Sequence, residues 1–344
     1  MAGLSIGKIR GLSSLSTEKG VFQILACDQR GAMVRLMEQA ARDAEGESGG
    51  ANLAPSYDQI VRVKLDIVGA LSPHATGALL DPEYGAATCV AHRALAGTCG
   101  LVVAVEATGY TEEAGDRLTE LLDDWGPAAV KAMGASAVKL LLYFNPRREK
   151  AAARQIEVVE QVAAECRRVD IPFMLEGVVY PTDYDDEAAF VREKVDLVVE
   201  SARILSRYDV DLYKVEFPVH AQGDERDWAD ACKRLNEACR VPWALLSAGV
   251  DFETYARQLE VACKAGASGF VAGRAIWKEA VTTPPGPERD AFVRGAMVER
   301  IKRLGAIAEA HARPWHRVPS HAYDPGETGE GWYATYGRQL ADAR

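Results

Sequence analysis

Eight short apolar runs, spread over 344 residues, limit the folds that this chain can adopt. Between them lie helix-like segments such as "RQIEVVEQVAAECRRV", in which apolar residues recur at three- and four-residue spacing. Near-continuous apolar runs that alternate with such helices are typical of a parallel sheet with covered faces. Eight units of this kind predict an α/β fold, a single (β/α)8 TIM barrel. The runs begin at Val21, Thr76, Gly100, Ala137, Pro172, Asp211, Trp243 and Gly269.

An open, doubly wound sheet is the alternative for alternating strands and helices. Such a sheet normally has fewer strands and a Gly-rich first turn, whereas the first run here ends in "CDQRG" without a GxGxxG motif. We therefore expect a barrel over 1–318 and a C-terminal tail over 319–344, where Pro, Gly, His and aromatic residues are frequent. The Gly/Ser/Ala-rich segment 44–56 indicates a loop after the first strand.

Composition excludes several classes of partner. A formal net charge of -10 argues against binding to nucleic acid or to an anionic membrane, since both need a basic surface. The N-terminus lacks an apolar run long enough for a signal peptide, and no apolar stretch of 18 residues occurs. Seven scattered cysteines without a CxxC pair indicate reduced thiols. We expect a cytoplasmic homo-oligomer.

A lysine inside a buried strand is the feature that points to function. Lys214 stands in "DLYKVEFPVH", which otherwise reads as core, and an ammonium is costly to remove from water. Alternation along the strand puts Lys214 and Glu216 on one inner face. Lys139 and Glu176 occur in the two preceding runs. A buried, purely structural Lys–Glu pair is the alternative, but so many buried charges favour a functional site.

Polar side chains also stand where the other predicted strands end. In a barrel of this kind the catalytic groups lie at the carboxyl ends of the strands. Any one of these residues could instead cap a helix, hold a loop or form a salt bridge. They are Asp28, Asp81, Glu83, Glu106, Ser247 and Arg274.

The inner lysines offer a specific chemistry. Desolvation and a neighbouring cation both lower the pKa of an amine, which frees it to attack a carbonyl and form a Schiff base. Lys139 is the candidate cation, and Glu176 is placed to move protons. An acid such as Glu216 beside the nucleophile would act in the opposite sense.

At these residues the chain resembles the class I, Schiff-base aldolases that act on tagatose 1,6-bisphosphate, together with their relatives that cleave sulfofructose phosphate. The resemblance runs in family order from about residue 21 to about residue 280. The family fold is a TIM barrel. The matching blocks are "ACDQRGAM", "LLDPEYG", "AVKLLLYF", "IPFMLEG", "DLYKVEFP", "LLSAGV" and "AGRAIW".

The resemblance implies roles for individual residues. Lys214 would form the Schiff base, Glu176 would serve as acid and base, Lys139 would lie beside them, and Asp28 would line the site. It implies neither a cofactor nor a metal. The substrate-binding residues would be Gln29, Arg30, Ser247, Gly249, Gly273 and Arg274.

The last four of these residues have a physical argument of their own for binding a phosphate. Loops after the seventh and eighth strands form the usual phosphate site of such barrels, at the start of a short helix. "SAGV" and "AGRAIW" supply small residues for close backbone approach and one arginine for a bidentate contact.

Two other functions compete with a Schiff-base aldolase. A metal-dependent aldolase would need converging histidines, but none lies on a predicted strand, and His311, His316 and His321 are spaced poorly for helical ligation. A non-catalytic sensor of sugar phosphates would be expected to lose the amine or its acid/base partner, and both are present.

The far end of the substrate is the least determined by the sequence. Blocks in the N-terminal half look more like the tagatose-bisphosphate enzymes, and those in the C-terminal half more like the sulfofructose-phosphate enzymes. Arg30 and the residues after Asp81 are the candidates for reading this end. We predict cleavage of tagatose 1,6-bisphosphate to dihydroxyacetone phosphate and glyceraldehyde 3-phosphate. The alternative is 6-deoxy-6-sulfofructose 1-phosphate, which would give dihydroxyacetone phosphate and sulfolactaldehyde.

Overall fold

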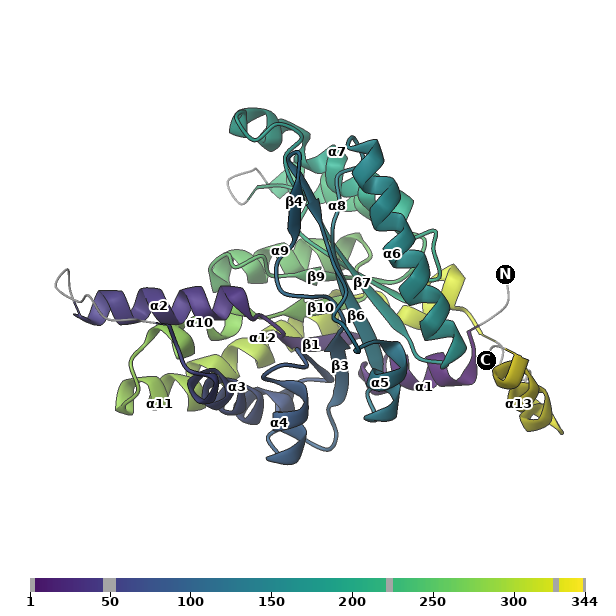
Figure 1. The fold of residues 1–344 in the computed structure, drawn as a ribbon, viewed down its shortest axis with the longest axis horizontal. Coiled ribbons are helices and arrows are strands. Elements are labelled where there is room, and N and C mark those ends of the chain that lie inside the picture. Colours follow the sequence, from purple (N-terminus) through teal and green to yellow (C-terminus); the bar gives the residue numbers. More distant parts are fainter. Residues whose placement is uncertain (1–3, 46–53, 221–224, 324–327, 343–344) are drawn as a thin grey trace.

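A computed structural model describes residues 4–45, 54–220, 225–323 and 328–342 and has a closed parallel barrel at its centre (Figure 1). Each strand pairs with its neighbours in chain order, and the last pairs with the first. The predicted eight-stranded barrel is therefore confirmed. The strands are β1 (Phe22–Cys27), β2 (Gly77–Leu80), β3 (Gly100–Ala104), β6 (Ala137–Tyr143), β7 (Phe173–Val178), β8 (Leu212–Val215), β9 (Trp243–Leu246) and β10 (Gly269–Ala272).

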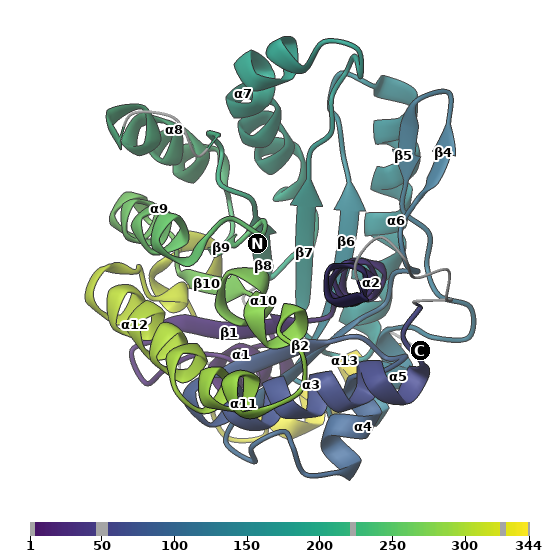
Figure 2. The same cartoon turned by 90° about the vertical axis from the view of Figure 1, so that its left-hand side faces the viewer.

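Helices surround the barrel and connect its strands (Figure 2). In the described residues, two α-helices follow β1 and four follow β10, the last of them in the C-terminal segment, whereas one α-helix follows each of the other barrel strands. Residues 46–53 of the predicted Gly-rich loop lie outside the described residues. The helices are α2 (Gly31–Glu45), α3 (Tyr57–Leu71), α4 (Ala86–Ala91), α5 (Pro127–Ala132), α6 (Glu149–Arg168), α7 (Glu187–Leu205), α8 (Glu225–Ala238), α9 (Phe252–Ala265), α10 (Arg274–Thr282), α11 (Pro287–Arg294) and α12 (Ala296–His311).

Alternation along each strand divides the core into two layers. On β8, Leu212 packs inside the barrel, whereas Tyr213 and Val215 pack against the helices. On β6, Ala137 lies inside, and the alternate residues from Val138 to Phe144 pack outside. Every second residue of a strand therefore points into the barrel, and near the carboxyl ends these inner positions carry the charged side chains.

The amino-terminal end of the barrel is closed by segments from both ends of the chain. Helix α1 (Ile6–Ser14) contributes Leu12, and Leu15 follows it. Trp315, in the short helix η2 (Trp315–Arg317), packs into the same inner cluster and is 2% exposed. Figure 1 shows α13 (Trp332–Asp342) beside α1, and Tyr336 on α13 donates to the Asp170 carboxylate that also accepts from the Gly7 amide on α1. The carboxyl end is left as the open mouth.

A small hairpin at the mouth was not predicted. Strands β4 (Thr111–Glu113) and β5 (Asp116–Leu118) pair in the loop between β3 and α5. Ala114 and Gly115 turn the chain with φ values of 52° and 80°, the left-handed conformation that tight hairpins require. Its strands are three residues long and mostly polar, so they lack the apolar pattern by which the barrel strands are found.

Among the described residues, none of the helices combines the length and apolar character needed to cross a lipid bilayer.

Candidate active site

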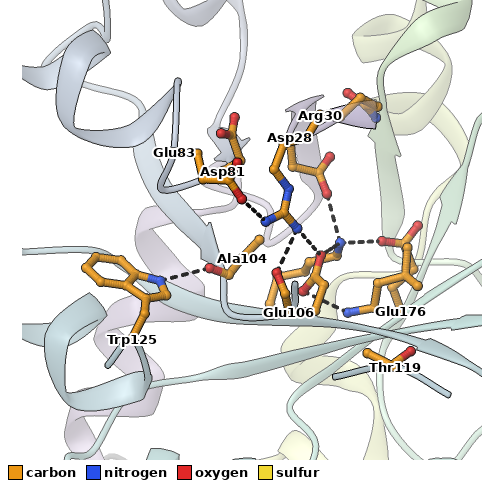
Figure 3. Close-up of polar contacts among 12 residues, drawn as sticks. Asp28, Arg30, Asp81, Glu83, Ala104, Glu106, Thr119, Trp125 and Glu176 are labelled. Atoms are coloured by element: carbon orange, nitrogen blue, oxygen red, sulfur yellow. Dashed lines mark hydrogen bonds and ion pairs between the residues drawn. The ribbon is translucent and has the colours of Figure 1, made fainter. Parts of the chain in front are cut away.

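Three acidic side chains converge on one ammonium at the mouth of the barrel. Lys139 Nζ lies 2.5 Å from Glu106 Oε1, 2.8 Å from Asp28 Oδ2 and 3.0 Å from Glu176 Oε2. Figure 3 shows the labelled side chains of Asp28, Glu106 and Glu176 turned toward the centre of one cluster. Asp28 and Glu106 follow β1 and β3, whereas Glu176 and Lys139 lie inside β7 and β6, so four strands build the cluster. Lys139 is 1% exposed.

The second inner lysine joins the same cluster through Glu176. Glu176 and Lys214 are neighbours in the register of β7 and β8, and Lys214 Nζ lies 2.8 Å from Glu176 Oε2. Both side chains are buried. One carboxylate oxygen therefore bridges the ammonium of Lys139 and the amine of Lys214, so a proton can pass between Lys214 and Glu176 without any movement of the backbone.

The charged groups in this cluster shift one another's pKa values. Burial acting alone would lower the pKa of Lys139, but Asp28, Glu106 and Glu176 outweigh it and hold this pKa well above its usual value. Burial acts to raise the pKa of Asp28 and of Glu176, but the nearby ammonium groups of Lys139 and Lys214 outweigh it and lower both values. Lys139 is thus held as a cation, and the lowered pKa values of Asp28 and Glu176 keep these two carboxyl groups ionised at neutral pH.

Glu216 does not share this cluster, contrary to the alternation argument. Strand β8 ends at Val215, so the pleat that would point Glu216 inward does not continue. Its carboxylate instead lies 3.0 Å from Lys194 Nζ on α7 and accepts a hydrogen bond from the Val179 amide. The acid beside the candidate nucleophile is therefore Glu176.

Among the buried side-chain oxygens that lack a hydrogen-bond partner within the described residues, two belong to Asp28 and Gln29, directly after β1. Asp28 uses Oδ2 to hold Lys139 and leaves Oδ1 without a partner. The side-chain oxygen Oε1 of Gln29 is also buried and also lacks a hydrogen-bond partner. Buried polar atoms are normally paired, so these two acceptors are available to hydroxyl groups of a bound ligand.

The residues predicted to bind a phosphate come together at the ends of β9 and β10. The Gly273 amide donates to Ser247 Oγ at 3.3 Å, and Gly273 precedes the first turn of α10. The Arg274 guanidinium packs on Gly249, where a Cβ would lie 3.1 Å from Cζ. A Cβ at Gly273 would approach the Ala26 carbonyl oxygen to 2.5 Å, so only glycine fits there. The Gly273 amide and the Ser247 hydroxyl are thus in contact where β9 and β10 end, and the Arg274 guanidinium lies on the Gly249 backbone nearby.

Arg30 is predicted to bind substrate, but its guanidinium already contacts two acceptors of the protein. Its Nη1 lies 2.8 Å from Glu83 Oε1, and its Nη2 donates to the Glu106 carbonyl oxygen at 2.7 Å (Figure 3). Asp81 has a structural role, because it receives Lys64 Nζ at 2.5 Å and the Tyr84 amide at 2.7 Å.

Two residues of the site were not selected from the sequence. Glu106 was noted at a strand end, where a capping role could not be separated from a functional one. Lys64, on α3, is fully buried and donates to the carbonyl oxygens of Cys27 and Gln29. The sequence feature that could have identified Lys64 is its position on the apolar face of the helix. It follows Ile60 by four residues and precedes Ile67 by three, and both isoleucines are buried.

The histidines of the C-terminal region make separate contacts. His311 lies near Glu260, and His321 is buried against the Asp211 carbonyl oxygen. His316 packs edge-on against Trp315. Within the part of the chain that the structure describes, no group of three or more His, Cys, Asp or Glu residues has the arrangement of a metal site.

Comparison with known sequences adds a family to this geometry. The sequence pattern of the family described as DeoC/LacD family aldolase matches residues 22–279. Tagatose 1,6-diphosphate aldolase of Lactococcus lactis subsp. lactis is 33% identical over 329 residues, covering 90% of this chain and 97% of that protein. The protein of the same name from Staphylococcus aureus (strain MSSA476) is 32% identical with the same coverage.

Solved structures support the fold. An archaeal fructose 1,6-bisphosphate aldolase superposes with a TM-score of 0.56 at 18% identity, covering 87% of this chain and 98% of that chain. Fructose-bisphosphate aldolase from Plasmodium falciparum gives 0.62 at 13% identity, covering 91% and 98%. At such identities the likeness is one of architecture.

Proposed function

This chain belongs to the DeoC/LacD family of class I aldolases, and on that premise we propose that it cleaves a ketohexose 1,6-bisphosphate. The preferred substrate is tagatose 1,6-bisphosphate, and the products are dihydroxyacetone phosphate and glyceraldehyde 3-phosphate. The names of the relatives that match over 90% of the chain support this substrate. The observation that carries the chemistry is Glu176, held between Lys139 and Lys214 at 3.0 and 2.8 Å.

Schiff-base formation uses the pair of Lys214 and Glu176. Glu176 takes a proton from the ammonium group of Lys214, and the resulting amine attacks the C2 carbonyl of the open-chain ketose and gives a carbinolamine. Loss of water from C2 then gives an iminium, which can accept an electron pair. Glu176 lies within hydrogen-bond reach of the amine, so it can take up and return the protons that these steps move. Lys139 keeps Glu176 and Asp28 oriented and ionised.

Cleavage breaks the bond between C3 and C4. Glu176 removes the proton of the C4 hydroxyl, the electron pair of the broken bond moves toward the iminium nitrogen, and an enamine forms. The aldehyde leaves with C4, C5 and C6. Protonation of the enamine at C3 and addition of water at C2 release dihydroxyacetone phosphate and restore Lys214. Ser247, Gly249, Gly273 and Arg274 would hold the phosphate on C1.

Borohydride trapping tests the nucleophile. Reduction in the presence of dihydroxyacetone phosphate should attach a three-carbon adduct to Lys214, located by peptide mass spectrometry. Lys214→Met should abolish both the adduct and the activity. Lys264→Met is the matched control, because Lys264 is exposed and paired with Glu260 on α9. An adduct on another lysine, or active enzyme that cannot be trapped, would contradict the assignment.

Substrate identity needs a direct comparison. We propose measuring kcat/KM for tagatose 1,6-bisphosphate, fructose 1,6-bisphosphate and 6-deoxy-6-sulfofructose 1-phosphate under identical conditions. The bisphosphates should be cleaved with the higher kcat/KM and with weak discrimination between the two epimers. A clear advantage for the sulfonated substrate would move the enzyme to sulfosugar cleavage.

A further inference from the structure

One arginine at the mouth of the barrel lies among aromatic rings. Arg117, on β5, has its guanidinium carbon 4.8 Å from the ring centre of Tyr110 and 5.2 Å from that of Tyr184. The corresponding distances to Tyr180 and Tyr143 are 5.8 and 6.0 Å. Each of these is within the range of a cation–π contact. The four rings hold the side chain in place without supplying a negative charge.

The charge of Arg117 is not neutralised by an acid. In the described ranges, no carboxylate lies within salt-bridge distance of its guanidinium, whereas Arg148, at the same hairpin, is paired with Asp116 at 2.5 Å. Arg30 likewise has Glu83 as its partner. Arg117 is half-buried, so its charge has lost part of its hydration. A half-buried cation without a counter-ion attracts an anion from solution.

The cluster is continuous with the active site through Tyr143. On β6, Lys139 and Tyr143 are both inner positions, and Tyr143 is the last residue of the strand. Burial raises the pKa of Tyr143, and the charges of Glu176 and Arg117 also act on it, so both groups are near this hydroxyl. The Tyr143 amide donates to Thr119 Oγ1 at 3.1 Å, which fixes the end of the hairpin segment to β6.

The order of the strands places this cation opposite the candidate phosphate site. Around the closed barrel the strands follow one another in the order β10, β9, β8, β7 and β6. Strand β6 therefore lies four strands from β10, on the opposite side of the eight-stranded barrel. Arg274 follows β10, Lys214 is on β8, and Glu176 is on β7. A ketose phosphate with C1 near Arg274, C2 at Lys214 and the C4 hydroxyl at Glu176 would continue toward β6.

We propose that Arg117, with the hydroxyl groups of the surrounding tyrosines, binds the anionic group on the last carbon of the substrate. This inference rests on the proposed function and extends it, because it assigns the site that recognises the aldehyde end. The ligand chemistry is a tetrahedral oxyanion, a phosphate or a sulfonate, which accepts hydrogen bonds from guanidinium and phenol donors.

The experiment compares substrates that differ only at the last carbon. We propose measuring kcat/KM of wild type, Arg117→Met and Arg117→Lys with tagatose 1,6-bisphosphate and with tagatose 1-phosphate. Arg117→Met should lose about 30- to 5,000-fold in kcat/KM on the bisphosphate, the range expected for removing one partner of a charge pair. It should stay within about twofold of wild type on the 1-phosphate, which leaves the site empty, and Arg117→Lys should fall between the two.

Arg148→Met is the matched control. Arg148 donates to the Ala114 carbonyl oxygen at 2.7 Å and binds Asp116, so its loss loosens the same hairpin without removing the unpaired cation. It should change both substrates by equal factors. Borohydride trapping of dihydroxyacetone phosphate, which lacks the last three carbons, should be unchanged in Arg117→Met and confirms that the variant is folded.

The outcomes separate this site from the proposed function. Equal losses on the two substrates, or no loss on the bisphosphate, would overturn the assignment of Arg117 while leaving the aldolase intact. If wild type prefers the sulfonate, the proposed bisphosphate fails, and Arg117→Met must then lose activity on the sulfonate and keep it on the 1-phosphate. Wild type that cleaves none of these ketoses would overturn both proposals.

Discussion

Lys139 is the residue on which the charge balance of the site depends. Three buried carboxylates share its ammonium, and each would repel the other two if it were absent. An ammonium at this point keeps Asp28 and Glu176 ionised in a place that solvent hardly reaches, so that Glu176 can act as a base while it remains fixed. The two lysines therefore have separate tasks, one as a constant charge and the other as a nucleophile.

Removal of that charge should make stability depend on pH. Lys139→Met should lower the free energy of unfolding by about 3–5 kcal/mol at pH 7.5, the cost of leaving buried charges without a partner. In wild type the pKa values of Asp28 and Glu176 are lowered, so stability from these acids is present above their ordinary pKa values and is lost on acidification. Without Lys139 the acids should take up protons more readily. The deficit measured by urea unfolding should therefore shrink between pH 7.5 and 5.5, and a constant deficit would contradict this account.

Arg274 should act on the phosphate and leave the chemical step unchanged. Arg274→Ala removes a guanidinium that packs on Gly249, and the drop in kcat/KM for phosphorylated substrate should correspond to a loss of about 2–5 kcal/mol of transition-state stabilisation. A substrate without the C1 phosphate should be affected little. Steady-state kinetics on both substrates provide the measurement. An unchanged kcat/KM with the phosphorylated substrate would remove Arg274 from the site.

At the scale of elements, the sequence predicts what the apolar pattern encodes. All eight barrel strands were found because each is a short apolar run, and a closed parallel barrel brings the inner residues of separate strands to one mouth. The structure therefore brings Asp28, Lys139, Glu176 and Lys214 together, and their catalytic roles stay a prediction. Glu216 was misplaced because strand ends are not visible in the pattern, and the β4–β5 hairpin was missed because its strands are short and polar.

Helix α3 positions the end of β1 through a buried ion pair. Lys64 Nζ contacts Asp81 Oδ2 at 2.5 Å and the carbonyl oxygens of Cys27 and Gln29 at 2.7 and 2.9 Å. Those carbonyls flank Asp28 on both sides in the chain. The pair therefore fixes the backbone that carries an acidic partner of Lys139.

A double-mutant cycle tests this ion pair. Lys64→Met should destabilise the fold by about 3–5 kcal/mol, because the Asp81 carboxylate would remain buried and uncompensated. Adding Asp81→Asn should recover part of that loss, with a coupling energy of about 1–3 kcal/mol. Thermal and urea unfolding of the four proteins give the cycle. Losses that simply add would show that Lys64 and Asp81 do not stabilise each other.

At the scale of the whole molecule, the two ends of the barrel differ in what their residues do. The carboxyl end carries the charges, whereas the amino end is closed by α1, Trp315 and the C-terminal segment. His321 is 2% exposed in this closure, with Nε2 2.8 Å from the Asp211 carbonyl oxygen and Nδ1 2.8 Å from Ser320 Oγ. A neutral ring satisfies both contacts, as donor to the carbonyl and acceptor from the hydroxyl. Stability at this end should therefore depend on pH separately from the active site.

Protonation of His321 should weaken the closure in mild acid. Burial lowers the pKa of His321 to about 4, mainly because the charged ring is desolvated. Its ordinary value is 6.5, so its contribution is complete above that pH and is lost as pH falls toward 4. Burial raises the pKa of Asp211 to about 6, against the lowering effect of Lys8. Protonation of Asp211 therefore adds stability as pH falls, which offsets the loss from His321 in wild type.

The variant His321→Gln separates the two effects, because it keeps a donor for the carbonyl but cannot titrate. Between pH 7 and 4.5 the stability of wild type relative to this variant should therefore fall by about 2 kcal/mol, and parallel pH profiles of the two proteins in urea unfolding would contradict the assignment.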